Sequence, residues 1–179
     1  MMDANNFEET ETLKNGLTVK IRAIRPADKA GIIDAFGKLD PESVYTRFFR
    51  AKGALSDQEL KAATEVDFEN VVALVVTTES AGKETIIGGG RYVAFNVSSA
   101  RSAEIAFIVE EDYQGLGLAG RILKYLAHIA REKGVSQFQA EVLPQNQAML
   151  AVFSRSGLPM QLSQAEGVTH VTLSLTDRL

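Results

Sequence analysis

The stretch from Ser102 to Lys133, SAEIAFIVEEDYQGLGLAGRILKYLAHIAREK, decides the fold of this chain. Its first part, Ser102–Val109, is rich in Ile, Phe and Val and predicts a strand. Its last part predicts an amphipathic helix over Leu116–Lys133, because apolar residues recur at helical spacing and Gly134 follows them. A glycine-rich loop, Gln114–Gly120, joins the two. The segment is therefore a strand–loop–helix unit with a permissive backbone at its turn.

Such a loop is suited to binding an anion. Its glycines allow close backbone approach, and the first turn of the following helix carries N–H groups without partners. A helix N-terminus of this kind favours a pyrophosphate group. The net charge of the chain is −4, so local groups must hold an anionic ligand.

The loop also fits two other interpretations. Gly115, Gly117 and Gly120 spell G-x-G-x-x-G, the dinucleotide fingerprint, and Glu141 lies near the distance of its ribose-binding acid. In that fold the first glycine follows the strand almost directly, whereas Glu110–Gln114 intervene here, which disfavours a nicotinamide cofactor. The second possibility is that the glycines serve only as a turn.

Outward from this segment, strands and helices alternate irregularly. A polar arm is expected over residues 1–15, loosely held, followed by one domain over 16–179. Ser56-Asp57-Gln58-Glu59 fits a capping box, and Gly88-Gly89-Gly90 inside a strand predicts a bulge or a close backbone approach. The other expected elements are a strand at Leu17–Arg25, helices opening at Pro26 and Asp40-Pro41, strands at Val71–Thr78, Thr85–Phe95 and Gln137–Leu143, a helix at Asn146–Ser156 and a strand at Val168–Leu175.

This order predicts an α/β (α+β) fold with a mixed, mostly antiparallel sheet and helices on both faces. Composition limits the function further. The 179 residues include no cysteine, which suits a reducing cytoplasm, and the acidic start lacks the features of a secretory signal. We expect no membrane span, no nucleic-acid partner and no metal, since His128 and His170 lie far apart.

Gln114, Gly117 and Ala119 form Q-x-x-G-x-A, which resembles the [RQ]-x-x-G-x-[GA] pattern of GNAT (GCN5-related) N-acetyltransferases. Downstream, Asn146–Gly157 (NQAMLAVFSRSG) resembles the N-x-x-A segment of that family, and the likeness covers about Val19 to Thr176. The N-terminal half (RAIRPAD, DPESVYTRFF, LSDQEL, EVDF) resembles the acetyltransferase domain of bacterial protein lysine acetyltransferases.

The resemblance implies acetyl-CoA as co-substrate, without a metal. It places the pantetheine arm along the backbone of Ile108 and Val109 and beside Asn146, with Phe153 near the thioester. The pyrophosphate would be held by the side chain of Gln114 and by the amides of Gly115, Gly117, Leu118, Ala119 and Gly120. Arg121 and Lys124 are candidates for the outer phosphates, although basic residues on a helix more often form its solvated face.

Transfer to an amine also needs a base and an oxyanion donor. Glu104 is the candidate base: it matches the family's glutamate, and partial burial among Ala103, Ile105 and Phe107 would make it more basic. The alternative is that it faces solvent or pairs with Arg91 or Arg101. The amide of Val109 is the candidate oxyanion donor.

One residue departs from the family pattern. Many GNAT enzymes carry a tyrosine that protonates the leaving thiolate where this chain has Phe153. A thiolate leaves tolerably without such an acid, and Tyr92 or Tyr113 could replace it.

The predicted function is thus an acetyl-CoA-dependent N-acetyltransferase acting on a primary amine, either a protein lysine or a small molecule. A non-catalytic acyl-CoA-binding sensor of the same fold is the alternative. The sequence leaves the acceptor and the oligomeric state open.

Overall fold

The computed structural model describes residues 4–37, 56–97, 100–109, 117–143 and 147–176. Its strands are β1 (Glu8–Thr12), β2 (Thr18–Ala23), β3 (Val71–Ser80), β4 (Lys83–Val97), β5 (Ala100–Val109), β6 (Gln137–Val142), β7 (Met160–Ala165) and β8 (Val168–Ser174). Its helices are α1 (Lys29–Gly37), α3 (Asp57–Thr64), α4 (Leu118–Glu132) and α5 (Gln147–Ser154), with 3-10 turns η1 (Ala4–Asn6) and η2 (Pro26–Asp28). The helix predicted from Asp40-Pro41 lies outside the described residues.

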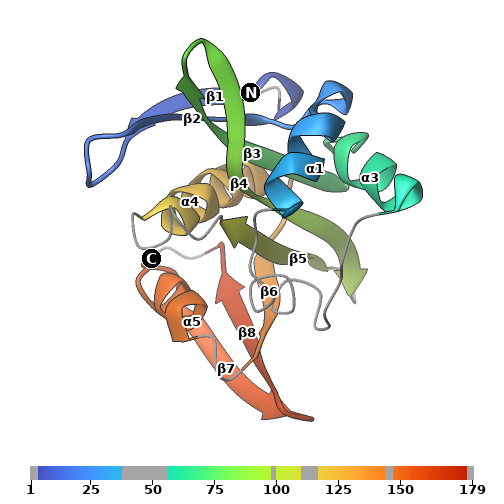
Figure 1. Ribbon diagram of the computed structural model, residues 1–179. Helices are drawn as coiled ribbons and strands as arrows, with labels where there is room; N and C mark the ends of the chain where they lie inside the picture. Colours follow the sequence, from blue (N-terminus) through green and yellow to red (C-terminus); the bar gives the residue numbers. More distant parts are fainter. Residues whose placement is uncertain (1–3, 38–55, 98–99, 110–116, 144–146, 177–179) are drawn as a thin grey trace.

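The described strands form one sheet in the order β1-β2-β3-β4-β5-β6-β8-β7, which Figure 1 shows running from the blue strands to the red ones. All neighbours are antiparallel except β5 and β6, which are parallel and joined through α4. The predicted mixed, mostly antiparallel sheet is confirmed. A dinucleotide-binding fold, with its mostly parallel sheet, does not fit this topology.

Helices pack on both faces of the sheet. Helix α4 covers the main core, in which its Ile122 and Leu126 meet apolar side chains of the central strands. Helix α1 packs on the other face, where its Ile32 joins a smaller cluster around Val75 and Ile86. The neighbouring residue Ile33 is 55% exposed, because adjacent residues of a helix point in different directions.

The glycines of β4 allow the neighbouring strand β3 to approach closely. The pairing of β3 with β4 shifts register between Val76 and Thr77, opposite the start of the glycine run. A Cβ on Gly89 would lie 2.7 Å from the carbonyl oxygen of Leu74. Both the predicted bulge and the predicted close approach are therefore present.

The N-terminal arm is not loosely held where the structure describes it. Strand β1 pairs with β2 from Glu8 opposite Arg22 to Thr12 opposite Thr18. Phe7 and Leu13, on either side of β1, are buried in the main core. The expectation was wrong because β1 (EETET) has no apolar alternation, so its position depends on the two flanking apolar residues.

Strand β7 was also missed. It forms a hairpin with β8 through Glu166 and Gly167, which both have positive φ angles of 53° and 77°. Two-residue hairpin turns with positive φ at both positions favour glycine at the second, so Glu166-Gly167 was a usable signal.

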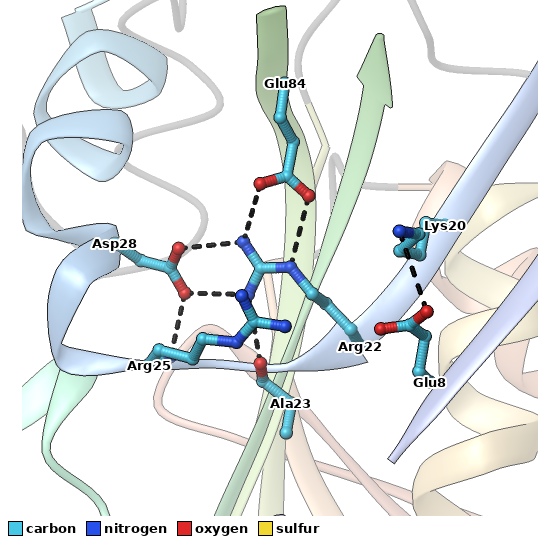
Figure 2. A network of polar contacts seen from close by, with 7 residues as sticks. All are labelled: Glu8, Lys20, Arg22, Ala23, Arg25, Asp28 and Glu84. Carbon is cyan, nitrogen blue, oxygen red and sulfur yellow. Dashed lines mark hydrogen bonds and ion pairs between the residues drawn. The ribbon is translucent and has the colours of Figure 1, made fainter. Parts of the chain in front are cut away.

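A buried ion network fixes the entry of α1 onto the sheet (Figure 2). The Arg22 guanidinium, 2% exposed, donates to both carboxylate oxygens of Asp28 at 2.9 and 2.8 Å. It also donates to Glu84 of β4 at 3.2 Å. Burial by itself would raise the pKa of Asp28, but bonds from Arg22 and from the Arg25 amide outweigh it and lower that pKa.

The predicted start of α3 is confirmed as well. The hydroxyl of Ser56 accepts a bond from the Glu59 amide at 3.1 Å, and the Glu59 carboxylate accepts one from the Ser56 amide at 2.9 Å. This is the reciprocal capping box that the sequence indicated.

Among the described residues, no helix combines the length and the apolar character needed to cross a bilayer.

Candidate active site

The sheet opens between β5 and β6. These two strands pair at only three positions, from Ser102 opposite Gln137 to Glu104 opposite Gln139. Beyond Glu104, β5 continues to Val109, and no described strand pairs with it on the β6 side. The backbone of Ile105–Val109 therefore offers an edge along which an extended ligand can lie.

Helix α4 begins at the same end of the sheet. In a parallel strand–helix–strand unit, the helix starts beside the carboxyl ends of the strands, where ligands commonly bind. Gly117 is the N-cap residue of α4 and has a left-handed φ of 88°. The amides of Leu118, Ala119 and Gly120 follow it in the first turn, which contains no acidic residue. These N–H groups have no acceptor within the helix, so the turn is suited to a diphosphate.

The side chains of this turn leave room for a ligand. Leu118 is buried in the main core, so only its backbone amide is available. Gly120 is exposed, and a Cβ built on it would meet no described atom within 4 Å. A bulky group can thus approach the helix at Gly120 without displacing the described part of the protein.

The other residues predicted to hold the co-substrate divide into two groups. Ile108 and Val109 lie at the end of β5, opposite Gly89 and Gly88 of β4, and Ile108 is half-buried. Gln114, Gly115 and Asn146 lie outside the described residues. The structure therefore brings the β5 edge and the α4 turn together at one end of the sheet.

Glu104 is exposed, and the expected partial burial is wrong. Successive residues of a strand point to opposite faces, so its neighbours Ala103 and Ile105 lie in the core while Glu104 projects from the other side. That side is the face carrying α1. Glu104 pairs with Val93, and Val93 pairs with Val71 of β3, which lies on the same face as Val75 in the cluster under α1.

Glu104 interacts electrostatically with Arg91. The β5 partner of Arg91 is Ala106, which places Arg91 diagonally from Glu104 on the same face. Burial lowers the pKa of Arg91, and the negative charge of Glu104 partly opposes this effect. Arg101, the other suggested partner, instead donates to the Glu69 carbonyl at 2.8 Å.

Two aromatic residues discussed for the thioester end of the site, Phe153 and the possible acid Tyr92, are core residues. Phe153 is 1% exposed, and its ring lies 6.0 Å from that of Phe107. Tyr92 is fully buried against Phe138, and burial raises the pKa of its hydroxyl well above the ordinary value. Its cross-strand partner is Ile105, so Tyr92 and Glu104 lie on different faces of the sheet. Tyr113 lies outside the described residues.

The basic residues of α4 have different environments. Lys124 is exposed, with its ammonium 5.0 Å from the centre of the Tyr125 ring. The Arg121 guanidinium is held by the Glu11 carboxylate of β1, at 3.0 Å. Sequence analysis missed Glu11, because the two partners are 110 residues apart and no local pattern links them.

The two histidines lie in ion pairs outside the candidate site. His128 pairs with Glu132 one turn along α4 at 3.4 Å, and His170 lies 3.6 Å from Glu141. Among the described residues, no three His, Asp or Glu side chains are grouped so that they could hold a metal ion.

Comparison with known proteins adds family evidence to this geometry. The model of the acetyltransferase (GNAT) family matches residues 41–158. The acetyltransferase PA5475 of Pseudomonas aeruginosa is 28% identical over 139 residues, which are 78% of this chain and 74% of that protein. The acetyltransferase Pat of Mycolicibacterium smegmatis is 29% identical over 81% of this chain, but the match spans only 42% of its own length.

Solved structures agree with this assignment. The GNAT domain of S. lividans PAT superposes with a TM-score of 0.84 at 30% identity, over 93% of this chain and 96% of that one. The putative acetyltransferase yncA of Salmonella typhimurium, solved with acetyl-CoA, has a TM-score of 0.69 at 19% identity, over 89% and 95% of the two chains. This second likeness supports the fold alone.

Proposed function

Since the chain belongs to the acetyltransferase (GNAT) family, we propose that it transfers an acetyl group from acetyl-CoA to a primary amine, with a protein lysine as the acceptor. One observation carries the proposal: the edge of β5 that no described strand covers lies at the same end of the sheet as the first-turn amides of α4, which have no acceptor within the helix. A long thioester with a diphosphate needs both an extended backbone partner and an anion site.

The co-substrate would be held mainly by backbone groups. Ile108 and Val109 would pair with the amide-containing arm, and the amides of Gly117–Gly120 would bind the diphosphate. Gln114, Gly115 and Asn146 are proposed to complete the site. Phe153 would contribute as an apolar wall behind the thioester, supported by its contact with Phe107.

Glu104 is proposed to remove the proton that blocks the acceptor amine. A lysine amine has an ordinary pKa of about 10.4, so making it neutral at pH 7 costs about 4.6 kcal/mol. The exposure of Glu104 supports this role in one respect, because a water molecule or an incoming amine can reach an exposed carboxylate. Glu104 is the last β5 residue that pairs with β6, so it lies where the two strands begin to separate.

The reaction then balances without another reagent. The neutral amine attacks the thioester carbonyl carbon, a C–N bond forms, and the Val109 amide would stabilise the oxyanion. The C–S bond breaks next, and CoA leaves as a thiolate that takes a proton from solvent. Glu104 passes to water the proton that it took from the ammonium group, and the attacking nitrogen, which is positively charged after the attack, releases its second proton to water as the amide forms. Phe153 has no hydroxyl, so no acid is assigned to the thiolate.

An acceptor screen tests this proposal. Purified protein is incubated with acetyl-CoA and either a pool of lysine peptides or a panel of small amines, and the products are weighed by mass spectrometry. Acetylated peptides are expected. If only small amines were acetylated, the acceptor would be a small molecule and not a protein lysine. Acetyl-CoA binding without any product would indicate the sensor, and a thermal shift with nicotinamide dinucleotide alone would contradict the family's co-substrate.

A further inference from the structure

A polar cluster links β1 to the first turns of α4. The Glu11 carboxylate accepts a bond from Arg121 Nε at 3.0 Å and another from the Tyr125 hydroxyl. Arg121 Nη2 also donates to the carbonyl of Thr12 at 3.4 Å. The Tyr125 ring packs on Phe7, with ring centres 5.1 Å apart. The N-terminal strand is thus attached to α4 by both polar and apolar contacts.

The carboxylate at the centre of this cluster is strongly held. The side chain of Glu11 is 19% exposed, and that of Arg121 is 27% exposed. The hydrogen bond from Tyr125 lowers the pKa of Glu11; burial opposes it, and Arg121 adds to it. Burial, followed by the bond to Glu11, raises the pKa of Tyr125 to about 12. Glu11 is therefore ionised at neutral pH.

Arg121 extends this link to the start of the helix. Its Nη1 donates to the Gly117 carbonyl at 3.3 Å. The same nitrogen lies 2.7 Å from the point where a Cβ would stand on Gly117, so the guanidinium rests against that residue. Gly117 is the left-handed N-cap residue from which the anion-binding amides follow. A chain of contacts thus runs from Glu11 through Arg121 to Gly117.

We propose that Glu11 is a positioning residue for the diphosphate site, acting through Arg121 on Gly117. This inference rests on the proposed function. Arg121 braces the turn and is not itself a phosphate ligand, because Glu11 neutralises its charge and its donors are directed at Glu11, Thr12 and Gly117. Holding the turn in its binding conformation before the ligand arrives increases affinity, since less order must be imposed on binding.

The isosteric variant Glu11→Gln tests the link. It keeps the shape of the side chain and removes the charge that holds Arg121. We expect acetyl-CoA to bind about fivefold or more weakly by calorimetry, with a matching rise in its KM. The kcat at saturating acetyl-CoA and the KM of the acceptor should stay unchanged, a separation that a general loss of stability would not produce.

Glu8→Gln is the matched control. Glu8 lies on the same strand, and its ion pair with Lys20, at 3.6 Å, is solvent-exposed. Affinity for acetyl-CoA should be unchanged in this variant. Arg121→Met should weaken binding as Glu11→Gln does, and the double variant should be little worse than either, because both remove one shared link.

The direction of the change decides between two arrangements. If Arg121 were a phosphate ligand restrained by Glu11, the Glu11→Gln variant would free it and acetyl-CoA would bind more tightly. Tighter or unchanged binding overturns the inference. If the wild-type protein itself bound no acetyl-CoA, the proposed function would fail and this inference with it, so the two failures are distinguishable.

A measurement on the wild-type chain covers the case in which the variant does not fold. Coupling between two sites is reciprocal, so acetyl-CoA must stabilise β1 if β1 stabilises its site. Saturating acetyl-CoA should slow hydrogen exchange at the amides of β1 more than at those of the distant strand β7. Equal slowing in both strands, or none in β1, overturns the inference.

Discussion

Cγ2 of Ile122, on α4, lies 2.7 Å from the point where a Cβ would stand on Gly90 of β4. The helix that is proposed to carry the diphosphate site therefore sits directly on the backbone of the sheet. The ring of Phe107 lies 2.8 Å from the same point. No side chain fits there unless the side chains of Ile122 and Phe107 shift.

The variant Gly90→Ala should consequently destabilise the fold. Inserting a methyl group into a packed core costs about 1–3 kcal/mol when its neighbours must shift. Chemical denaturation would measure this as a lower midpoint with an unchanged slope. Gly120→Ala is the matched control, because no described atom lies within 4 Å of its Cβ position. A Gly90→Ala variant as stable as the wild type would contradict the packing described.

Gly120 should be sensitive to size only when the ligand is present. We expect Gly120→Leu to fold with nearly normal stability, since the described surroundings of that position are open. Its side chain would project into the space proposed for the diphosphate, and acetyl-CoA affinity should fall at least about tenfold, roughly 1.4 kcal/mol. Calorimetric titration of Gly120→Leu beside Gly120→Ala checks this. Equal affinities would place the diphosphate elsewhere.

Replacing the proposed base should slow transfer without weakening acetyl-CoA binding. Glu104→Gln removes the proton acceptor, and a positioned base typically contributes about 10²–10⁴-fold to a rate. We therefore expect kcat to fall about a hundredfold or more, with an unchanged dissociation constant for acetyl-CoA. Glu141→Gln is the control, an exposed strand carboxylate beside His170. Unchanged turnover in Glu104→Gln would remove Glu104 from the mechanism.

The Arg22–Asp28 pair should be costly to break from either side. Asp28→Asn leaves the Arg22 guanidinium buried with only Glu84 as a charged partner. Removing one member of a buried pair costs about 3–5 kcal/mol, so the melting temperature should fall markedly. Glu65→Gln, which breaks the exposed ion pair with Lys29, should change it little. Equal melting temperatures for Asp28→Asn and wild type would contradict the network's role.

The pH dependence of stability follows from the same group. The pKa of Asp28 is lowered in the folded state. The contribution of Asp28 to the free energy of unfolding is therefore complete above the ordinary aspartate pKa of about 3.9. It is lost as the pH falls below that value, toward the folded-state pKa. Wild-type stability should decrease with falling pH across this range, and Asp28→Asn should show a shallower decrease. Denaturation at several pH values tests the difference in slope.

Local sequence predicted the elements that have a strong pattern. The apolar spacing of α4, the β-branched run of β3 and the Ser56 capping box each encode structure within a few residues. The glycine loop likewise predicted an anion-binding turn, and Gly117 has the left-handed φ that favours glycine. Strand β1 was not predictable in this way, because its polar residues carry no periodic signal.

The sequence by itself determined the fold class and the location of the glycine turn that is proposed to bind the diphosphate, because periodicity and glycine conformation are local properties. Only the tertiary structure decided the face of Glu104 relative to α1, the opening between β5 and β6, and the contact of Glu11 with Arg121. Each of these depends on which distant strands pair and in which register. Pairing is set by the burial of the whole core, and no short segment encodes it.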